Sequence, residues 1–409
     1  MKFVGQIIKH VLMKILVLNC GSSSIKYQLL EMPAEKVMAV GVVERIGEPM
    51  GKIKMEIDGN KEAFDLPVEN HEIGVSKVID LLLDPKRSLI SSPDEIKAIG
   101  HRIVHGGEYF SESVELTPDA IAKIAECNDF APLHNPANLK GIKAAQAALP
   151  KAVNCGTFDT AFHQTMEPVA YMYGLPYKYY EQYKIRRYGF HGSSHRYVSQ
   201  EAAKMMNKPL NNCKTIVCHI GNGSSVTAVV NGKSVDTSMG FTPLEGVIMG
   251  TRAGNVDLGA AFQMMRRENL TIDQIDNIVN KQSGLKGIAG VSDMRDLQSM
   301  AANGDAKANL AKQMLALSIK KYVGAYLAEI GGADCIAFAG GIGEHDGDVR
   351  KNILSGLECF GIEIDQAANS KQGESWVIST PNSKIKVFVI QTNEEIVIAR
   401  DTYKIVTEK

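Results

Sequence analysis

Arginine and histidine side chains gather in short, glycine-flanked segments that show no helix or strand periodicity. The segments are 100–107, 186–195 and 250–255. Cations and hydrogen-bond donors in glycine-rich loops are well suited to bind oxyanions such as carboxylates and phosphates, so we expect a site for anionic substrates. For His101, His105 and His195 we expect structural roles, because a histidine that holds the backbone by hydrogen bonds is the commoner case.

Four turns rich in glycine or hydroxyl residues could offer backbone N–H groups to phosphate. They are 19–24, 221–225, 250–254 and 340–343. None of them matches the GxxxxGK[ST] pattern of a P-loop or a GxGxxG turn between a strand and a helix. A phosphate site in this chain therefore needs another arrangement.

The first two of these turns lie in similar strand patterns about two hundred residues apart. Apolar runs at 15–18, 25–30 and 36–43 surround the first turn, and runs at 215–220, 226–230 and 233–236 surround the second. Asn231-Gly232 is a typical hairpin turn. We interpret the chain as two related domains that each begin with a hairpin, with one turn from each directed into a cleft between them. A chance recurrence of two Gly/Ser hairpins is the alternative.

The remainder of the second half alternates helix and strand signals. Apolar residues recur with helical spacing over 306–330, and Gly331-Gly332 indicates where that helix ends. A strand at 335–339, the fourth glycine-rich turn and a helix over 349–357 follow. A strand, a glycine-rich turn and a helix in this order can cradle a nucleotide, because bare backbone N–H groups approach anions closely.

A last strand over 385–390 precedes an apolar helical tail. We expect Thr392 to cap this helix and Glu395 to complete the capping box. The domain boundary should fall in an ordinary loop, which divides the chain into 13–160 with 394–409, and 161–393. Residues 1–12 are interpreted as an N-terminal extension, with Met13 as an alternative start.

Length and composition exclude several classes of protein. The 409 residues favour about two domains, and the net charge of −1 argues against nucleic acid or a membrane surface as a partner. The seven cysteines contain no CxxC pair, so we expect core thiols in a reducing cytoplasm and neither disulfides nor a zinc site. No apolar run reaches the ~18 residues of a transmembrane helix.

Taken together, these segments resemble the acetate kinases (acetokinase family) of the acetate and sugar kinase/Hsc70/actin superfamily. The resemblance covers essentially the whole chain after Met13. It rests on the segments 18–26, 100–107, 158–163, 189–195, 219–223, 240–246 and 392–395, which follow the order of the family. It implies an α/β fold of two duplicated actin/ribonuclease H-like domains, with mixed β-sheets flanked by helices and the active site in the interdomain cleft.

The resemblance also implies an activity and its partners. The chain would be a homodimeric, cytoplasmic enzyme that transfers a phosphoryl group reversibly and in line from ATP to acetate, giving acetyl phosphate and ADP. Mg²⁺ would be required, and Mn²⁺ could substitute for it. Closure of the two domains would exclude water from the site.

Site residues are carried over by the same resemblance. The acceptor side and the transition state would be served by Arg102 (carboxylate or phosphoryl group), His191 and Arg252 (transition state) and Asp159 (positioning, by holding an arginine). The metal would be organised, largely through water, by Asn19 and Glu394. The methyl group would lie in an apolar pocket made by Val104, Leu133, Phe190 and Pro243.

The nucleotide would contact several glycine-rich segments. The ATP phosphates would lie against Ser22, Ser24, Lys26, His219, Ile220, Gly221, Asn222 and Gly223. The nucleoside would be bordered by Asp293, Met294, Arg295, Gly341, Ile342, Gly343, Glu344 and His345.

The chemistry of the reaction explains why such a set is cationic. A small carboxylic acid has a pKa near ~4.3, so it is already ionised at neutral pH and needs no strong general base. It is an anion that must attack a polyanion, and the enzyme supplies positioning and positive charge. Asp159 is therefore predicted not to be the proton acceptor.

Some positions depart from the family pattern. His345 stands where the family usually has Asn, which affects the nucleoside contact. Ala253, Asn255 and Leu258 replace the commoner Ser, Asp and Pro, and Ser193 replaces Thr with its hydroxyl kept. Both catalytic arginines remain.

Two alternatives stay open on the sequence alone. A propionate or other short-chain carboxylate kinase would share the mechanism, because one methylene discriminates by only ~1–3 kcal/mol. An actin-like or Hsc70-like ATPase would share the architecture. That ATPase would not need the set formed by Arg102, Asp159, His191 and Arg252.

Overall fold

The computed structural model describes residues 11–408, so most of the predicted extension at 1–12 lies outside the described residues. The chain divides into two compact units, one of residues 1–161 with 393–409 and the other of residues 162–392. The boundaries predicted after residues 160 and 393 lie within one residue of these limits.

The first unit contains an eight-stranded mixed sheet in the order β5-β4-β3-β2-β1-β6-β8-β7. Its strands are β1 (Met13–Cys20), β2 (Ser24–Met32), β3 (Lys36–Glu44), β4 (Gly51–Ile57), β5 (Asn60–Leu66), β6 (Ile96–Ile103), β7 (Val114–Glu115) and β8 (Val153–Phe158). The helices are α1 (His71–Leu83), α2 (Pro118–Glu126), α3 (Asn135–Ala148) and α15 (Glu394–Thr407). Strands β1 to β5 pair antiparallel, whereas β1, β6 and β8 run parallel.

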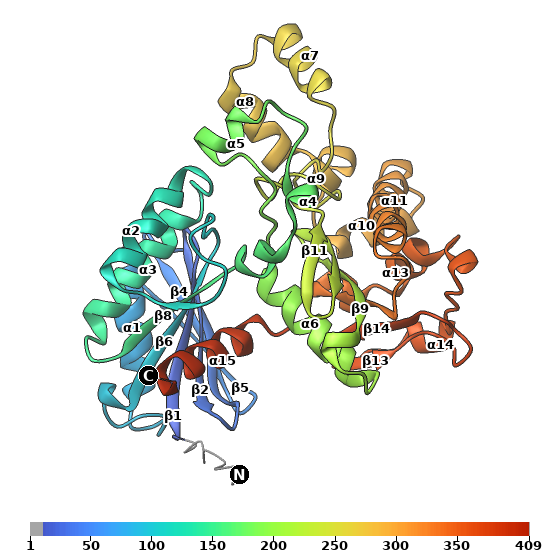
Figure 1. The fold of residues 1–409 in the computed structure, drawn as a ribbon. Helices are drawn as coiled ribbons and strands as arrows, with labels where there is room; N and C mark the ends of the chain where they lie inside the picture. The colour runs from blue at the N-terminus through green and yellow to red at the C-terminus, as the bar shows by residue number, and fades with distance from the viewer. Residues whose placement is uncertain (1–10, 409) are drawn as a thin grey trace, which may run out of the picture. The chain divides into compact units, whose positions relative to one another are not determined.

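Side-chain alternation along β1 assigns the helices of this unit to opposite faces of the sheet. Leu16 and Leu18 pack in one apolar core with residues of α1 and α3. Val17 points to the other face, where its parallel neighbour Gly100 on β6 lies against Ile398 of α15. Figure 1 shows α15, drawn in red, crossing this sheet.

The second unit contains a six-stranded sheet in the order β11-β10-β9-β12-β14-β13. Its strands are β9 (Lys214–Ile220), β10 (Ser224–Val230), β11 (Lys233–Thr237), β12 (Cys335–Ala339), β13 (Ser375–Val377) and β14 (Lys386–Ile390). Its helices are α4 (Pro168–Tyr171), α5 (Lys178–Tyr183), α6 (Gly192–Met205), α7 (Leu258–Glu268), α8 (Ile272–Asn277), α9 (Gly284–Ala289), α10 (Met294–Ala302), α11 (Ala306–Glu329), α12 (Gly340–His345), α13 (Gly347–Leu354) and α14 (Gln366–Asn369).

The sheet of this second unit is also covered on both faces. Ile216 and Cys218 of β9 pack in a core with α11, whereas Val217 packs with Val198 and Ala202 of α6. Helices therefore flank both sheets, as the α/β prediction requires.

The two units repeat one topology, which confirms the predicted duplication. In each unit a hairpin (β1–β2 or β9–β10) continues into an antiparallel third strand. The first strand of each hairpin also begins a run of three parallel strands, β1-β6-β8 in one unit and β9-β12-β14 in the other. The hairpin turn at Asn231-Gly232 is confirmed by positive φ at both residues. The C-terminal end of α11 is confirmed at Gly331-Gly332, where the N–H of Gly332 bonds to the carbonyl of Leu327 at 2.7 Å.

Three local predictions need correction. Asn393, not Thr392, caps α15, because its side chain accepts from the N–H of Ile396, while the Thr392 hydroxyl pairs with Ser194. Glu395 therefore does not complete a capping box, since the third residue of the helix is Ile396. The fourth glycine-rich turn is itself the short helix α12, and the helix predicted over 349–357 spans Gly347–Leu354.

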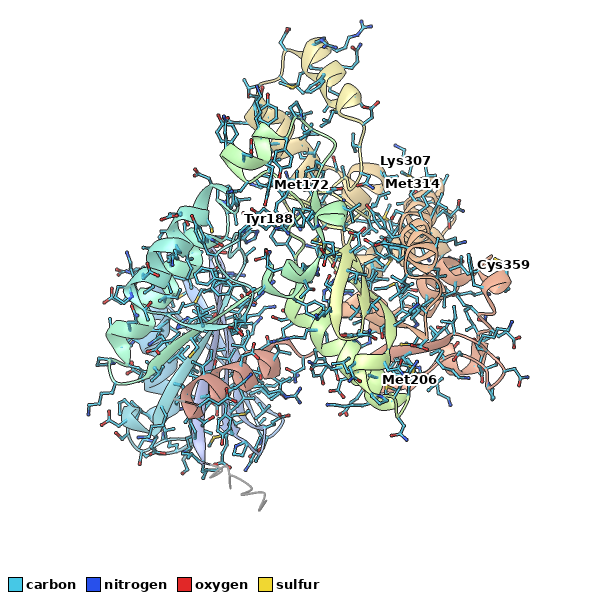
Figure 2. The ribbon with its side chains drawn as sticks, viewed as in Figure 1. Met172, Tyr188, Met206, Lys307, Met314 and Cys359 are labelled. Atoms are coloured by element: carbon cyan, nitrogen blue, oxygen red, sulfur yellow. The ribbon has the colours of Figure 1, made fainter. Side chains whose placement is uncertain are left out.

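The prediction that most of the cysteines are core thiols is confirmed. All seven thiols are free and six are buried, while Cys359 is exposed on the second unit (Figure 2). Within residues 11–408, every helix is too short or too polar to cross a lipid bilayer.

Candidate active site

In the first unit, Arg102 is held by the carboxylate that directly follows the neighbouring parallel strand β8. Its Nε and Nη2 atoms donate to Asp159 Oδ1 and Oδ2 at 2.9 and 2.7 Å, a bidentate pair. Glu394 Oε2 lies 3.9 Å from Arg102 Nε. Burial alone would lower the pKa of Arg102, but the carboxylates of Asp159 and Glu394 outweigh it and raise that pKa. Asp159 thus holds an arginine, and Arg102 stays cationic.

The other predicted residues of this half-site share the face of the sheet that carries α15. Asn19 and Lys26 are direct cross-strand partners, and alternation places both on the face of Val17. Arg102 lies two residues beyond Gly100 on the same face. Glu394 is the first residue of α15, which covers this face.

The carboxylate of Glu394 responds to these neighbours. Burial raises the pKa of Glu394 most strongly, while the charges of Arg102 and Lys26 oppose that rise. A half-buried carboxylate beside two cations can also help to hold a divalent ion. Within residues 11–408 no group of three or more His, Cys, Asp or Glu side chains is placed to bind a metal. Any metal here would depend on one carboxylate, an amide oxygen, water and phosphate.

In the second unit, His191 takes a strained position at the start of α6. Its φ of 56° lies in the left-handed region of the backbone map, which residues other than glycine rarely adopt. Its Nδ1 lies 2.9 Å from Ser225 Oγ, and its ring centroid is 4.4 Å from that of His219. Ser194 Oγ lies 2.8 Å from His219 Nδ1. The fold therefore fixes both rings beside the second hairpin turn.

Arg252 approaches the same turn from the 246–255 loop. A Cβ on Gly223 would lie 3.4 Å from His191 Nε2 and 3.6 Å from Arg252 Nη1, so both groups converge on this glycine. The Gly250 N–H donates to the Asn222 carbonyl at 3.1 Å and joins loop to turn. Burial lowers the pKa of Arg252. Among the described residues Arg252 has no carboxylate partner, so its charge is available to an anion.

The three histidines assigned structural roles are all buried and hydrogen-bonded. His101 Nε2 lies 2.8 Å from Asn154 Oδ1, and His195 Nε2 lies 2.7 Å from Ser225 Oγ. His105 Nδ1 accepts from the Gly107 N–H at 3.0 Å, so it alone makes the expected backbone bond.

The nucleoside candidates separate into exposed and buried groups. Asp293 caps α10 and pairs with Arg295, whose side chain is 88% exposed. Met294, by contrast, packs in the core of the unit. The Glu344 carboxylate is buried and accepts from the backbone N–H groups of Gly340 and Thr392 at 2.8 and 3.1 Å. The side chains of Met294 and Glu344 therefore support the fold.

Gly341, Ile342 and Gly343 lie in α12, which ends at His345. His345 Nδ1 lies 2.9 Å from Gln372 Oε1, and both residues line a polar hollow of about 410 Å³. A Cβ on Gly221 would lie 4.0 Å from the Gly341 nitrogen, so α12 starts beside the second hairpin turn.

The residues predicted for a methyl pocket come from both units. Val104 is 8% exposed and Phe190 is buried, whereas Leu133 is 58% exposed. Pro243 is half-buried. Each unit thus contributes two of the four residues, and the pocket itself remains a prediction.

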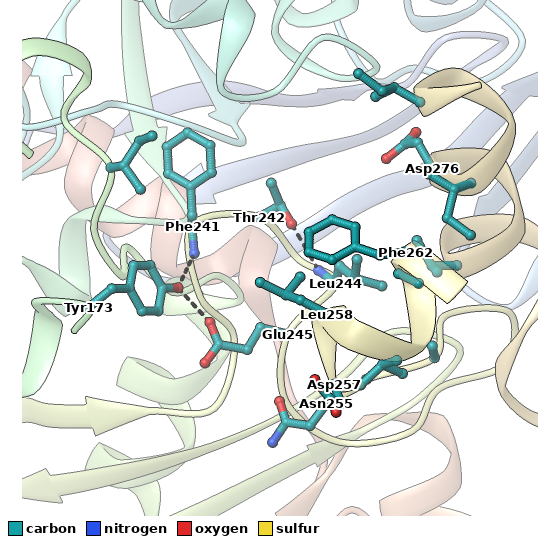
Figure 3. Close-up of a pocket in the computed structure, with 18 of the residues that line it drawn as sticks. Tyr173, Phe241, Thr242, Leu244, Glu245, Asn255, Asp257, Leu258, Phe262 and Asp276 are labelled. Atoms are coloured by element: carbon teal, nitrogen blue, oxygen red, sulfur yellow. Dashed lines mark hydrogen bonds between the residues drawn. The ribbon is translucent and has the colours of Figure 1, made fainter. Parts of the chain in front are cut away.

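A large apolar hollow of about 1050 Å³ lies behind the loop that carries Pro243 and Arg252 (Figure 3). Its lining includes the chain neighbours of both residues. The Tyr173 hydroxyl donates to Glu245 and accepts from the Phe241 N–H at 2.8 Å, as the dashed lines show. This contact fixes one end of the loop from behind.

Several positioning residues could not be recognised in the sequence. His71 and Asn138 hold the carbonyls of Gly21 and Cys20, and Ser225 lies between two histidines. Ser225 is the last residue of the turn at 221–225, which the sequence does indicate. The first two stand 50 and 118 residues from their partners, and no local pattern links them.

Two copies of one α/β topology, with cationic groups in both units, fit the class of two-domain phosphotransferases that the sequence resemblance predicted. Residues 14–400 match the acetokinase family. The chain belongs to that family.

Individual relatives agree with this assignment. The chain is 50% identical to the acetate kinase of Carboxydothermus hydrogenoformans over 398 residues, which cover 97% of this chain and all of the relative. The crystal structure of Porphyromonas gingivalis acetate kinase is similar with a TM-score of 0.93, 46% identity, and coverage of 96% of this chain and 100% of that one. A Francisella tularensis propionate kinase is similar with a TM-score of 0.90, 41% identity, and coverage of 95% and 99%.

Proposed function

We propose that this chain is an acetate kinase, which transfers the γ-phosphoryl group of ATP reversibly to acetate. Membership of the acetokinase family over residues 14–400 supports the proposal. The observation that carries it is Arg252, a half-buried guanidinium that has no carboxylate among the described residues and that meets His191 at Gly223.

The reaction needs no proton transfer. A carboxylate oxygen of ionised acetate attacks the γ-phosphorus, a new P–O bond forms, and the bond to the bridging oxygen breaks as ADP leaves with its electron pair. Arg102, held by Asp159, would bind the acetate carboxylate or the phosphoryl oxygens. Arg252 and His191 would stabilise the charge on the phosphoryl group in the transition state. For this step the acetate oxygen bound by Arg102 must reach the γ-phosphorus beside Arg252 and His191.

Arg252→Gln tests this role against Arg266→Gln, which removes the same charge from the exposed surface of α7. The Arg252 variant should lose about a hundredfold or more in kcat, measured by trapping acetyl phosphate as its hydroxamate. The Arg266 variant should match the native enzyme. Equal activity of all three proteins would remove Arg252 from the mechanism. ATP turnover without hydroxamate in the native enzyme would instead favour an ATPase.

We propose Mg²⁺ as the metal, with Mn²⁺ able to replace it. One carboxylate, Glu394, and one amide, Asn19, share a face of the first unit, which fits an ion that keeps several waters and binds phosphate oxygens. When bound, the ion would neutralise charge on the phosphates. Chelation should abolish activity, and added Mg²⁺ should restore it. Full activity in excess EDTA would contradict the requirement.

For the nucleotide, we propose that the phosphates lie against the two hairpin turns and the nucleoside beside α12 and Asp293. His345, with Gln372, would contact the nucleoside in place of the family's usual Asn. This contact is tested by comparing the relative kcat/KM for ATP, GTP and ITP between the native protein and the His345→Asn variant. An unchanged nucleotide preference would place the nucleoside elsewhere.

Propionate is the second candidate substrate, because a propionate kinase is among the structural relatives. Leu133, one of the residues predicted for the methyl pocket, is 58% exposed. The ratio of kcat/KM on acetate, propionate and butyrate decides the assignment. We expect acetate to lead, and a clear preference for propionate would overturn that choice.

We also propose that the enzyme is a cytoplasmic homodimer. The family resemblance supports the dimer, and seven free thiols are typical of a reducing compartment. Size-exclusion chromatography with light scattering should give twice the chain mass of 44.5 kDa. A mass of one chain would contradict the dimer.

A further inference from the structure

The first hairpin turn is held from behind by a buried histidine. His71 is the first residue of α1 and only 7% exposed, and its Nε2 lies 2.7 Å from the carbonyl oxygen of Gly21. A carbonyl oxygen can only accept a hydrogen bond, so His71 carries its hydrogen on Nε2 and donates it.

This bond sets the direction of the next backbone N–H. In a trans peptide the carbonyl oxygen and the following N–H point to opposite sides of the chain. With the Gly21 oxygen turned toward α1, the N–H of Ser22 is directed away from α1. In the described part of the chain the Ser22 N–H meets no acceptor, whereas the Gly21 N–H is used by the Ser24 carbonyl at 2.8 Å.

A second tie holds the preceding peptide. Asn138 of α3 donates from Nδ2 to the Cys20 carbonyl at 2.8 Å, and its Oδ1 accepts from the Val104 N–H at 3.1 Å. Helices α1 and α3 pack on the same face of the sheet, opposite to α15. Two consecutive carbonyls are therefore drawn toward one side, and the hairpin tip keeps one orientation.

We propose that His71 is a positioning residue for phosphate binding, which fixes the Gly21–Ser22 peptide so that the Ser22 N–H faces the ATP phosphates. This inference rests on the proposed function, in which that turn binds the triphosphate. A fixed donor loses no orientational freedom when the anion binds. His71 touches no substrate and acts only through the peptide.

Two nearly isosteric replacements separate donation from packing. Glutamine can place an N–H close to the position of Nε2, whereas glutamate presents only acceptors there when ionised. His71→Glu should weaken ATP binding by about tenfold or more, the scale of a lost hydrogen bond to a charged group. His71→Gln should remain within about threefold of native. Should His71→Glu fail to fold, His71→Met provides the same comparison with a neutral side chain that cannot donate.

The readout is nucleotide affinity by calorimetry, with adenosine as comparator because it lacks phosphate. We expect the loss for ATP and none for adenosine, and an unchanged KM for the carboxylate at saturating ATP. Val78→Ala, a buried change on the same helix, should lower the melting temperature and leave ATP affinity unchanged.

Equal losses in the Gln and Glu variants, or equal losses for ATP and adenosine, would overturn the role of His71. ATP binding that is unaffected in both His71→Glu and His71→Met would overturn it as well. The proposed function fails by a different result, namely a native enzyme that binds ATP but forms no acyl phosphate. The two failures are thus distinguishable.

Discussion

Arg102 and Asp159 are joined by two parallel hydrogen bonds, Nε to Oδ1 at 2.9 Å and Nη2 to Oδ2 at 2.7 Å. The carboxylate is buried, while about a fifth of the arginine side chain is exposed. Because Nη1 takes no part in this pair, that edge of the guanidinium can face an anion. Asp159 therefore orients a cation. The proposed phosphoryl transfer releases no proton for its carboxylate to accept.

This relationship predicts a partial loss of activity in Asp159→Asn. An amide oxygen can still accept one of the two hydrogen bonds, but the charge that fixes the guanidinium is gone, and Glu394 at 3.9 Å can then attract Arg102. We expect kcat/KM for the carboxylate to fall about 10- to 100-fold, or ~1.4–2.8 kcal/mol, in the hydroxamate assay.

Arg102→Lys is the matched change on the other side of the pair. Lysine keeps the charge but cannot form the planar bidentate contact, so we expect a loss of at least the same size. Complete inactivity of Asp159→Asn, with its fold intact by circular dichroism, would make the aspartate charge itself essential.

Ser225 leads to a second prediction, because its hydroxyl lies between two imidazoles. Its Oγ is 2.7 Å from His195 Nε2 and 2.9 Å from His191 Nδ1. Burial holds the pKa of His195 well below its usual range, so that ring is neutral. If His195 donates to Ser225, the single hydroxyl hydrogen goes to His191 Nδ1, and His191 keeps its hydrogen on Nε2, the atom that faces Gly223.

Ser225→Ala should therefore lower kcat about tenfold, while the KM for ATP stays within about twofold, since the change affects the orientation of His191, for which we propose a role in stabilising the transition state. Ser199→Ala is the control, because the Ser199 hydroxyl is buried in α6 and donates to the Arg196 carbonyl at 2.9 Å. Similar kinetics for both variants would exclude the relay through Ser225.

Local patterns predicted the framework of the fold but not its long-range ties. The hairpins and α11 followed from apolar periodicity and from turn residues that require positive φ. The predicted cap of α15 was wrong because Thr392 and Asn393 are neighbours and both are good capping residues. The choice between them depends on Ser194, which lies about two hundred residues away and engages the Thr392 hydroxyl.

The candidate site shows the same division. Arg102, His191 and Arg252 stand in glycine-flanked segments whose composition suits anions, and the family resemblance assigns their roles. The expected loop around Arg102 is in fact the end of strand β6, because residues 96–103 pair in the sheet. The sequence could not predict which of the two arginines, Arg102 or Arg252, is paired with a carboxylate. Arg102 meets Asp159 because β6 and β8 are parallel neighbours. The path of its loop leaves Arg252 without a carboxylate partner within residues 11–408.

Asn138 gives a third prediction, since it joins the first hairpin turn to the loop after Arg102. Its amide bonds both the Cys20 carbonyl and the Val104 N–H. Asn138→Ala should reduce the free energy of unfolding by about 1–3 kcal/mol, the cost of leaving buried groups unpaired, and should lower kcat/KM by about tenfold or more. Denaturant unfolding and the hydroxamate assay measure the two effects.

The control for this variant is Asn154→Ala. Asn154 is also buried and also bonds two partners, His101 and the Ala152 carbonyl, and neither partner belongs to the first hairpin turn or to the loop after Arg102. We expect a similar loss of stability with activity within about threefold of native. A parallel loss of activity in both variants would show that Asn138 acts through stability alone.

The pH dependence of stability is the fourth prediction, and it depends on His101. Burial lowers the pKa of His101 from 6.5 to about 4, although its hydrogen bond to Asn154 opposes the change. Between these values the unfolded chain binds a proton that the folded chain does not, so the free energy of unfolding falls as the pH is lowered from 6.5 to 4. The shift corresponds to about 3 kcal/mol, and burial of His195 acts in the same direction.

Urea unfolding at pH 7 and pH 4.5 measures the loss, which should be smaller in His101→Gln because that variant has no imidazole to protonate. An identical pH dependence in the two proteins would mean that His101 is not protonated on unfolding in this range, and the acid sensitivity would then have to come from other groups.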